Sequence, residues 1–180
     1  MENDNKINLL IMAGGTGSRM NLSDKGLLMI RGETLVDRNL NLLEDSVKKV
    51  YMAVSPNTEK TANFFKDRVT IIKTAGDDYS IDIGVALDAL DSFPVLVMPA
   101  DIYIRDLTVV TNLIDMAREK GKGITSMLIE GLFCGVSVFM EKPKDVETED
   151  FYGYNVTEKQ AYNINTVEDF FLILNRLRKE

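Results

Sequence analysis

A short apolar strand that runs into a glycine-rich loop constrains the fold of this chain more than any other feature. The run from Ile7 to Met12 is typical of a buried strand. The stretch that follows, Ala13 to Ser18, reads AGGTGS, and its glycines let backbone amides approach an anion because no side chain stands in the way. Arg19 and Lys25 add positive charge a few residues later. The pattern predicts a phosphate-binding loop after the first strand.

Two better-known glycine loops do not fit this stretch. A P-loop needs Lys and then Ser or Thr directly after its last glycine, whereas Gly17 is followed by Ser and Arg. The dinucleotide fingerprint needs a third glycine where Met20 stands, and its ribose-binding acid should end a second strand. The acids at that distance instead begin an expected helix. The loop is therefore expected to bind a phosphate chain in some other way.

Composition excludes several kinds of catalysis. The chain has no histidine, which removes Ser-His-Asp and Cys-His catalysis and the HExxH zinc site. Cys134 is its one cysteine, so an intramolecular disulfide or a thiolate metal cluster cannot form. Because Cys134 lies within an apolar run, we expect a small core residue, with a reactive thiol as the alternative.

Length, charge and hydropathy indicate a single domain that neither binds nucleic acid in general nor spans a membrane. The 180 residues fit one domain, spanning 1–180. No apolar run approaches the roughly 18 residues of a membrane span, and the polar start MENDNK does not resemble a signal peptide. A net charge of −7 disfavours general nucleic-acid binding. We expect a cytoplasmic protein with small-molecule substrates and a local basic site for any anion.

Apolar runs alternate with segments of helical spacing along the chain. Strands are expected at 7–12, 50–54, 69–72, 95–98, 124–128 and 133–139, and helices at 34–43, 58–65, 81–90, 106–121 and 166–177. Thr34 with Asp37, and Thr166 with Asp169, have capping-box spacing, while Asp106 is expected to cap the fourth helix. The acidic stretch 141–150 is expected to be a solvated loop. This alternation predicts an α/β fold with a largely parallel sheet covered by helices on both faces.

Three loops of the predicted sheet end up at one edge. In open α/β sheets, ligands bind beyond the carboxyl ends of the strands. The glycine loop, Ser55 to Thr58, and Pro99 to Asp101 each follow an expected strand. Asp101 suits Mg²⁺, which uses one or two carboxylates and fills its other positions with water and phosphate oxygens. That Asp101 merely caps a turn is the alternative.

At this point the residues resemble a known superfamily. AGGTGSRM, followed by Asp24 to Leu28, resembles the signature of small nucleotidyltransferases related to molybdenum-cofactor guanylyltransferase, the MobA-like superfamily. Asp101 falls where that superfamily keeps its metal aspartate, and Asn163 to Asp169, NINTVED, resembles its NINTPED segment. The chain departs from the pattern at Asn21, where a glycine often stands. The resemblance implies a three-layer α/β/α, Rossmann-like nucleotidyltransferase fold, a nucleoside triphosphate substrate and Mg²⁺.

Two further segments resemble one group within the superfamily, the archaeal GTP:adenosylcobinamide-phosphate guanylyltransferases. Val54 to Thr61 resembles that group's SPNTxKT segment, and Gly76 to Ile83, GDDYSIDI, resembles its GxGYxxDL segment. The resemblance implies transfer of GMP from GTP to adenosylcobinamide phosphate, with release of pyrophosphate, in cobalamin biosynthesis. Three alternatives stay open: a molybdenum-cofactor guanylyltransferase, another small nucleotidyltransferase, and a non-catalytic nucleotide-binding regulatory domain.

The resemblance also implies roles for individual residues. Arg19 and Lys25 would offset charge during catalysis, and Asp101 would hold magnesium. The implied nucleotide-binding residues are Ala13, Gly14, Gly15, Thr16, Gly17, Ser18, Arg19, Lys25, Ser55, Asn57, Thr58, Gly76, Tyr79 and Asp82. Because the second pKa of a phosphate monoester is near 6, the acceptor phosphate is already mostly a dianion at neutral pH and needs no general base.

Several of these residues have simpler explanations that the sequence leaves open. Ser55 to Thr58 could be a turn that caps a helix. Tyr79 could stack on a base or pack within the protein. Asn163 and Asn165 could contact the acceptor or the metal, or they could hydrogen-bond the end of a strand before the Thr166 cap.

Overall fold

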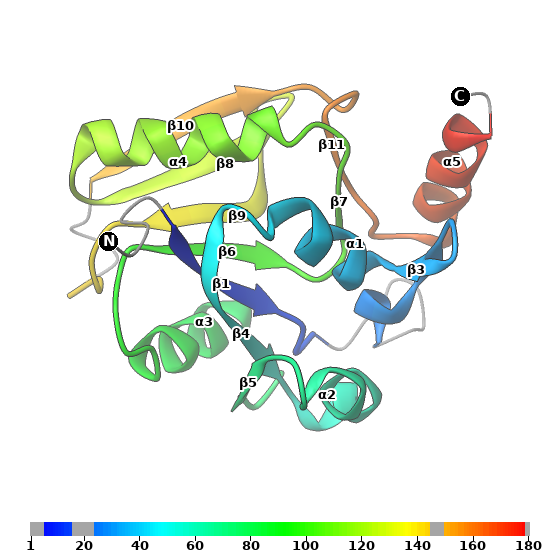
Figure 1. Cartoon of the computed structure of the whole chain (residues 1–180), viewed down its shortest axis with the longest axis horizontal. Coiled ribbons are helices and arrows are strands. Elements are labelled where there is room, and N and C mark those ends of the chain that lie inside the picture. Colours follow the sequence, from blue (N-terminus) through cyan, green and yellow to red (C-terminus); the bar gives the residue numbers. More distant parts are fainter. Residues whose placement is uncertain (1–5, 16–23, 145–149, 179–180) are drawn as a thin grey trace.

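A seven-stranded sheet forms the centre of the computed structural model, which describes residues 6–15, 24–144 and 150–178. Its strands are β1 (Ile7–Met12), β4 (Val47–Val54), β5 (Thr70–Lys73), β6 (Val95–Pro99), β8 (Ile124–Ile129), β9 (Leu132–Phe139) and β10 (Phe151–Val156). They lie in the order β10-β8-β9-β6-β1-β4-β5 (Figure 1). β9 runs antiparallel to its neighbours β6 and β8, and the other adjacent strands are parallel. The predicted α/β fold with a mostly parallel sheet is confirmed.

Helices pack on both faces of the sheet (Figure 1). They are α1 (Leu35–Leu43), α2 (Glu59–Phe65), α3 (Tyr79–Asp88), α4 (Thr108–Lys120) and α5 (Val167–Leu177), with single 3₁₀ turns η1 (Lys25–Leu27) and η2 (Pro56–Thr58). Successive side chains of β1 point to opposite faces of the sheet, as they do in any β-strand. Leu9 and Ile11 pack in the core cluster that holds α1, α2 and α4, while Leu10 and Met12 pack in the cluster that holds α3.

Two short antiparallel pairs extend the fold beyond the sheet. They are β2 (Met29–Ile30) with β3 (Glu33–Thr34), and β7 (Ile102–Ile104) with β11 (Ala161–Asn163). α5 packs on both through a third apolar cluster that includes Ile173 and Leu177. In the second pair Asn163 lies opposite Ile102, and the Ile164 amide donates to the Asp101 carbonyl at 2.9 Å. The C-terminal segment is thereby tied to Asp101, in the turn that follows β6.

The helix starts test the sequence predictions directly. The Thr34 side chain accepts from the Asp37 amide, and Thr166 and Asp169 form a reciprocal capping box, both as predicted. The predicted cap at Asp106 is confirmed by its hydrogen bonds, because Asp106 Oδ1 accepts from the Thr108 amide and hydroxyl, although the helix itself begins at Thr108 with Leu107 between them. No helix in the described ranges has the length and apolar character to cross a membrane.

The order of the strands reverses beside β1. The chain goes from β1 outward through β4 and β5, then returns to β6 on the other side of β1. Such a reversal of strand order is where open α/β sheets bind ligands. Met12, at the end of β1, pairs with Ala53 on one side and with Pro99 on the other. The glycine loop, the turn after β4 and the segment after β6 therefore begin side by side.

Candidate active site

Three chain segments meet tightly at Gly14, Ser55 and Gly76. The Ser55 hydroxyl donates to the Gly14 carbonyl at 2.5 Å. Gly76 has a φ of 84°, and a Cβ there would lie 2.5 Å from the Ser55 Cβ and 2.8 Å from the Gly14 carbonyl oxygen. Any side chain at Gly76 would strain the backbone and collide with both neighbours. The predicted nucleotide-binding residues Gly14, Ser55 and Gly76 thus form one compact wall.

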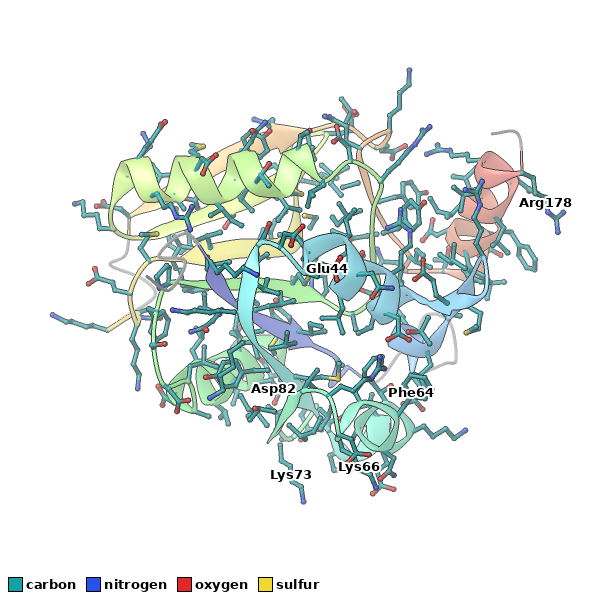
Figure 2. All side chains as sticks on the ribbon, viewed as in Figure 1. Glu44, Phe64, Lys66, Lys73, Asp82 and Arg178 are labelled. Atoms are coloured by element: carbon teal, nitrogen blue, oxygen red, sulfur yellow. The ribbon has the colours of Figure 1, made fainter. Side chains whose placement is uncertain are left out.

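A buried carboxylate, that of Asp82, accepts hydrogen bonds from one residue of this wall, Gly76. Asp82 lies in the first turn of α3 beside the sheet and is 5% exposed (Figure 2). Both its oxygens accept from the Gly76 amide, at 3.2 and 3.0 Å. Thr74 also packs against Gly14, since a Cβ on Gly14 would lie 3.0 Å from the Thr74 hydroxyl oxygen. Thr74 was missed by sequence reasoning, because a threonine at the end of a strand carries no signal of its own.

The turn after β4 has the capping structure that the simpler explanation predicted. The Ser55 hydroxyl accepts from the Asn57 amide at 3.2 Å, and the Thr58 hydroxyl accepts from the Ser55 amide at 3.0 Å. Ser55 and Thr58 are buried, whereas Asn57 is exposed. Capping does not exclude ligand binding by Asn57, so nucleotide contact by this turn stays a prediction.

On the other side of β1, Lys25 and Asp101 form an ion pair. Lys25 Nζ lies 2.8 Å from Asp101 Oδ2, and their side chains are 13% and 21% exposed. The same ammonium lies 3.4 Å from the Ile164 carbonyl oxygen. Gly26 lets the η1 turn sit this close, because a Cβ there would lie 2.9 Å from a Val36 methyl carbon. Two of the three predicted catalytic residues are therefore brought together; the third, Arg19, lies outside the described residues, as do Thr16, Gly17 and Ser18.

Oxygen donors beside this pair suit magnesium. The Asn163 amide nitrogen donates to the Cys134 carbonyl at 3.2 Å, while its Oδ1 is buried with no hydrogen-bond partner within the described part of the chain. An orphaned amide oxygen next to the Asp101 segment is a hard ligand of the kind that Mg²⁺ binds. No group of three or more acidic, Cys or His side chains gathers among residues 6–15, 24–144 and 150–178. A few protein oxygens completed by phosphate and water are the usual Mg²⁺ arrangement. Asn165 instead uses its backbone amide, which donates to Asp169 at 2.9 Å.

Tyr79 and Cys134 border the same region. Burial, with the negative charge of Asp101 and then of Cys134, raises the pKa of Tyr79 to about 12, although 44% of the residue is exposed. Cys134 is 4% exposed, and burial raises the pKa of its thiol to about 11. The prediction of a core cysteine is confirmed, because a reactive thiol needs a lowered pKa and access.

The structure also contains an apolar groove of 720 Å³. It lies on the α3 face of the sheet, between α3 and strands β8, β9 and β10, and Tyr79 stands in its wall. Phe133 and Phe151 also line it and are 58% and 57% exposed. Large exposed apolar surface in a concavity is typical of a binding site.

These features define a nucleotidyltransferase-type α/β domain, and the comparisons agree. Residues 9–136 match the family described as the MobA-like NTP transferase domain, so the chain belongs to that family. The chain is 33% identical over 113 residues to the adenosylcobinamide-phosphate guanylyltransferase of Methanocaldococcus jannaschii, covering 59% of this chain and 57% of that protein. It is 26% identical over 144 residues to the molybdenum cofactor guanylyltransferase of a Shewanella species, covering 77% and 70%.

Solved structures share the fold at low sequence identity. The CTP:phosphocholine cytidylyltransferase of Streptococcus pneumoniae superposes with a TM-score of 0.69 at 14% identity, over 96% of this chain and 99% of that one. Rv0371c of Mycobacterium tuberculosis gives 0.73 at 14% identity, over 94% and 98%. The Rossmann-like nucleotidyltransferase fold that the sequence resemblance implied is confirmed.

Proposed function

We propose that this protein transfers GMP from GTP to adenosylcobinamide phosphate and releases pyrophosphate. The observation that carries the proposal is the Lys25–Asp101 pair, which lies at the switch point of the sheet across β1 from the Gly14–Ser55–Gly76 wall. Membership of the MobA-like family supports nucleotidyl transfer. The 33% identity to an adenosylcobinamide-phosphate guanylyltransferase favours that acceptor, over part of both chains.

The chemistry needs charge neutralisation and alignment more than proton transfer. The acceptor phosphate, with its second pKa near 6, attacks the α-phosphorus as a dianion. Lys25 offsets charge on the phosphates, and backbone amides of the glycine loop approach them without side-chain interference. Asp101 and the Asn163 amide oxygen would hold Mg²⁺, which neutralises phosphate charge when bound. A chain without histidine can carry out this reaction.

We assign the apolar groove to the body of the acceptor. Tyr79 lines the groove, and the negative charge of Asp101 contributes to the raised pKa of Tyr79. The wall assigned to the nucleotide lies across β1 from the Lys25–Asp101 pair. An acceptor with a large apolar body could lie along α3 and the β8–β10 strands and present its phosphate to the α-phosphorus.

A parallel acceptor assay tests the proposal. The protein is incubated with GTP and Mg²⁺ plus adenosylcobinamide phosphate, molybdopterin or no acceptor, and pyrophosphate is measured. We expect release with adenosylcobinamide phosphate alone, because the 26% identity to the molybdenum-cofactor enzyme is lower. Release with molybdopterin alone would instead indicate a molybdenum-cofactor guanylyltransferase. GTP binding by calorimetry without turnover on either acceptor would indicate a non-catalytic nucleotide-binding domain.

A further inference from the structure

The residue before Lys25 is anchored to a helix far along the chain. Asp24 Oδ1 accepts from the Thr61 amide at 3.0 Å and from the Thr61 hydroxyl at 2.7 Å. The two residues are 37 positions apart, and Thr61 is 1% exposed. A hydroxyl donor this deeply buried is costly unless it is satisfied, and Asp24 satisfies it.

This contact caps α2 from outside the helix. Thr58, which precedes α2, uses its hydroxyl within the η2 turn and makes no side-chain capping hydrogen bond to α2 among the described residues. The Asp24 carboxylate instead accepts from a backbone amide in the first turn of α2, that of Thr61. A negative charge at this end of a helix also interacts favourably with the helix dipole. Because η2 leads directly into α2, the same contact ties Asp24 to the turn that begins at Ser55.

Lys25 is thereby held at both of its backbone neighbours. On one side Asp24 is bonded to Thr61, and on the other Gly26 is wedged against Val36 and Ala100, where a Cβ would lie 2.9 and 3.3 Å from their side-chain carbons. A lysine side chain is a flexible four-carbon stem, so the position of its backbone sets where the ammonium can reach. Here it reaches Asp101 at 2.8 Å.

We propose that Asp24 and Thr61 are positioning residues for Lys25, acting through the backbone of the η1 turn. This proposal rests on the proposed function, in which Lys25 contacts the triphosphate. It also gives Thr61, one of the residues in the SPNTxKT resemblance, a specific task. Asp24 and Thr61 do not touch the reacting groups; they fix the distance from Lys25 to them and link it to the Ser55 turn.

Thr61→Val tests this, because it keeps the shape of the side chain and removes the hydroxyl donor. We expect kcat to fall about 10- to 100-fold, since small misplacements of a catalytic group cost that much. GTP affinity measured by calorimetry should change less than kcat, and Thr61→Ser should restore turnover. Asp24→Asn, which keeps a weaker acceptor, should give an intermediate kcat. If Thr61→Val does not fold, the kcat values of Thr61→Ser and Asp24→Asn are compared instead. The proposal then predicts a lower kcat in Asp24→Asn than in Thr61→Ser.

The chain offers a matched control at α4. Asp106 Oδ1 accepts from the Thr108 amide at 3.0 Å and from its hydroxyl at 2.7 Å, the same pair of contacts at another helix start. Thr108→Val should lower the melting temperature without lowering kcat. Equal kcat losses in Thr61→Val and Thr108→Val, or full turnover in Thr61→Val, would overturn the proposal.

A double-mutant cycle separates positioning from general destabilisation. If Thr61 acts through Lys25, Thr61→Val should have no further effect on kcat in a Lys25→Ala background. Additive losses would contradict the proposal. If the wild type shows no turnover, the proposed function fails, and the same cycle measured on GTP affinity by calorimetry decides whether Thr61 still acts through Lys25.

Discussion

Lys25 and Asp101 lie 76 positions apart in the sequence, yet Lys25 Nζ is 2.8 Å from Asp101 Oδ2. Each belongs to a different segment of the switch point: Lys25 to η1, before α1, and Asp101 to the turn that follows β6. With exposures of 13% and 21%, the pair is shielded enough to interact strongly but open enough to meet a ligand. In the proposed reaction both partners exchange this contact, Lys25 for a phosphate and Asp101 for the metal.

Lys25→Ala should abolish most turnover while the fold is retained. Removing one charged contact to a transferring phosphoryl group is comparable to removing an oxyanion donor, which costs about 10²- to 10³-fold in kcat. Steady-state pyrophosphate release measures this, with circular dichroism to check the fold. The matched control is Lys49→Ala, because Lys49 pairs with Asp91 on the surface, where the two side chains are 46% and 69% exposed. Wild-type turnover in Lys25→Ala would remove Lys25 from the mechanism.

Asp101→Asn should lose metal-dependent activity with a modest effect on stability. The amide keeps an oxygen that can accept from Lys25 Nζ, but it removes the charge that binds Mg²⁺. We expect lower turnover at every Mg²⁺ concentration and a midpoint shifted to higher Mg²⁺. Asp91→Asn serves as the surface control. A titration curve that overlays the wild type would show that Asp101 is not a ligand.

Phe133→Ala tests the assignment of the groove to the acceptor. Covering an exposed phenyl ring stabilises a complex by about 1.5 kcal/mol, so KM for adenosylcobinamide phosphate should rise about tenfold while KM for GTP stays unchanged. Phe171→Ala is the control, because Phe171 on α5 has the same 58% exposure but does not line the groove. If the groove instead binds a second copy of the chain, Phe133→Ala would change the sedimentation coefficient and leave both KM values alone.

Most of the sheet was predictable from the sequence, because its central strands are buried on both faces. β6 reads as an apolar run, and β1 as one interrupted only by Asn8, and each was predicted to within a residue or two. β10 was not predicted, since this edge strand has exposed positions at Phe151, Gly153 and Asn155 and little apolar pattern. The three-residue strands β7 and β11 are held by pairing with each other, which no local pattern reports.

Individual residues of the candidate site could be predicted from the sequence, whereas the hydrogen bonds that join them could not. Gly14 and Asp101 follow expected strands, and Lys25 lies in the basic segment after the glycine loop. Their residue types and positions were therefore enough to predict them as site residues. The Asp24–Thr61 and Asp82–Gly76 contacts depend on how helices pack after the chain has folded. The capping turn at Ser55 was one of two explanations in the sequence, and the structure contains that turn.

Cys134 should be unreactive in the folded protein and reactive after unfolding. Burial raises its pKa from about 9 to about 11, so the thiolate is scarce at pH 8. Because the unfolded thiol ionises first, its contribution to stability is complete below pH 9 and is lost as the pH rises toward 11. Alkylation followed by mass spectrometry, with and without denaturant, checks the first point, and urea unfolding at several pH values checks the second. Fast labelling of the native protein would contradict the buried position.

Gly76→Ala should weaken GTP binding and destabilise the fold, because φ at Gly76 is 84° and a Cβ would lie 2.5 Å from Ser55. The new methyl group would push Ser55 away from the Gly14 carbonyl and open the wall that these residues form. Gly84→Ala is the control, since Gly84 lies within α3 and a Cβ there meets nothing within 4 Å. That change should stabilise the protein by about 0.5–1 kcal/mol, as alanine does in a helix. Thermal unfolding with and without GTP measures both effects. A Gly76→Ala protein as stable and as responsive to GTP as the Gly84→Ala protein would show that the contact of Gly76 with Ser55 does not support the site.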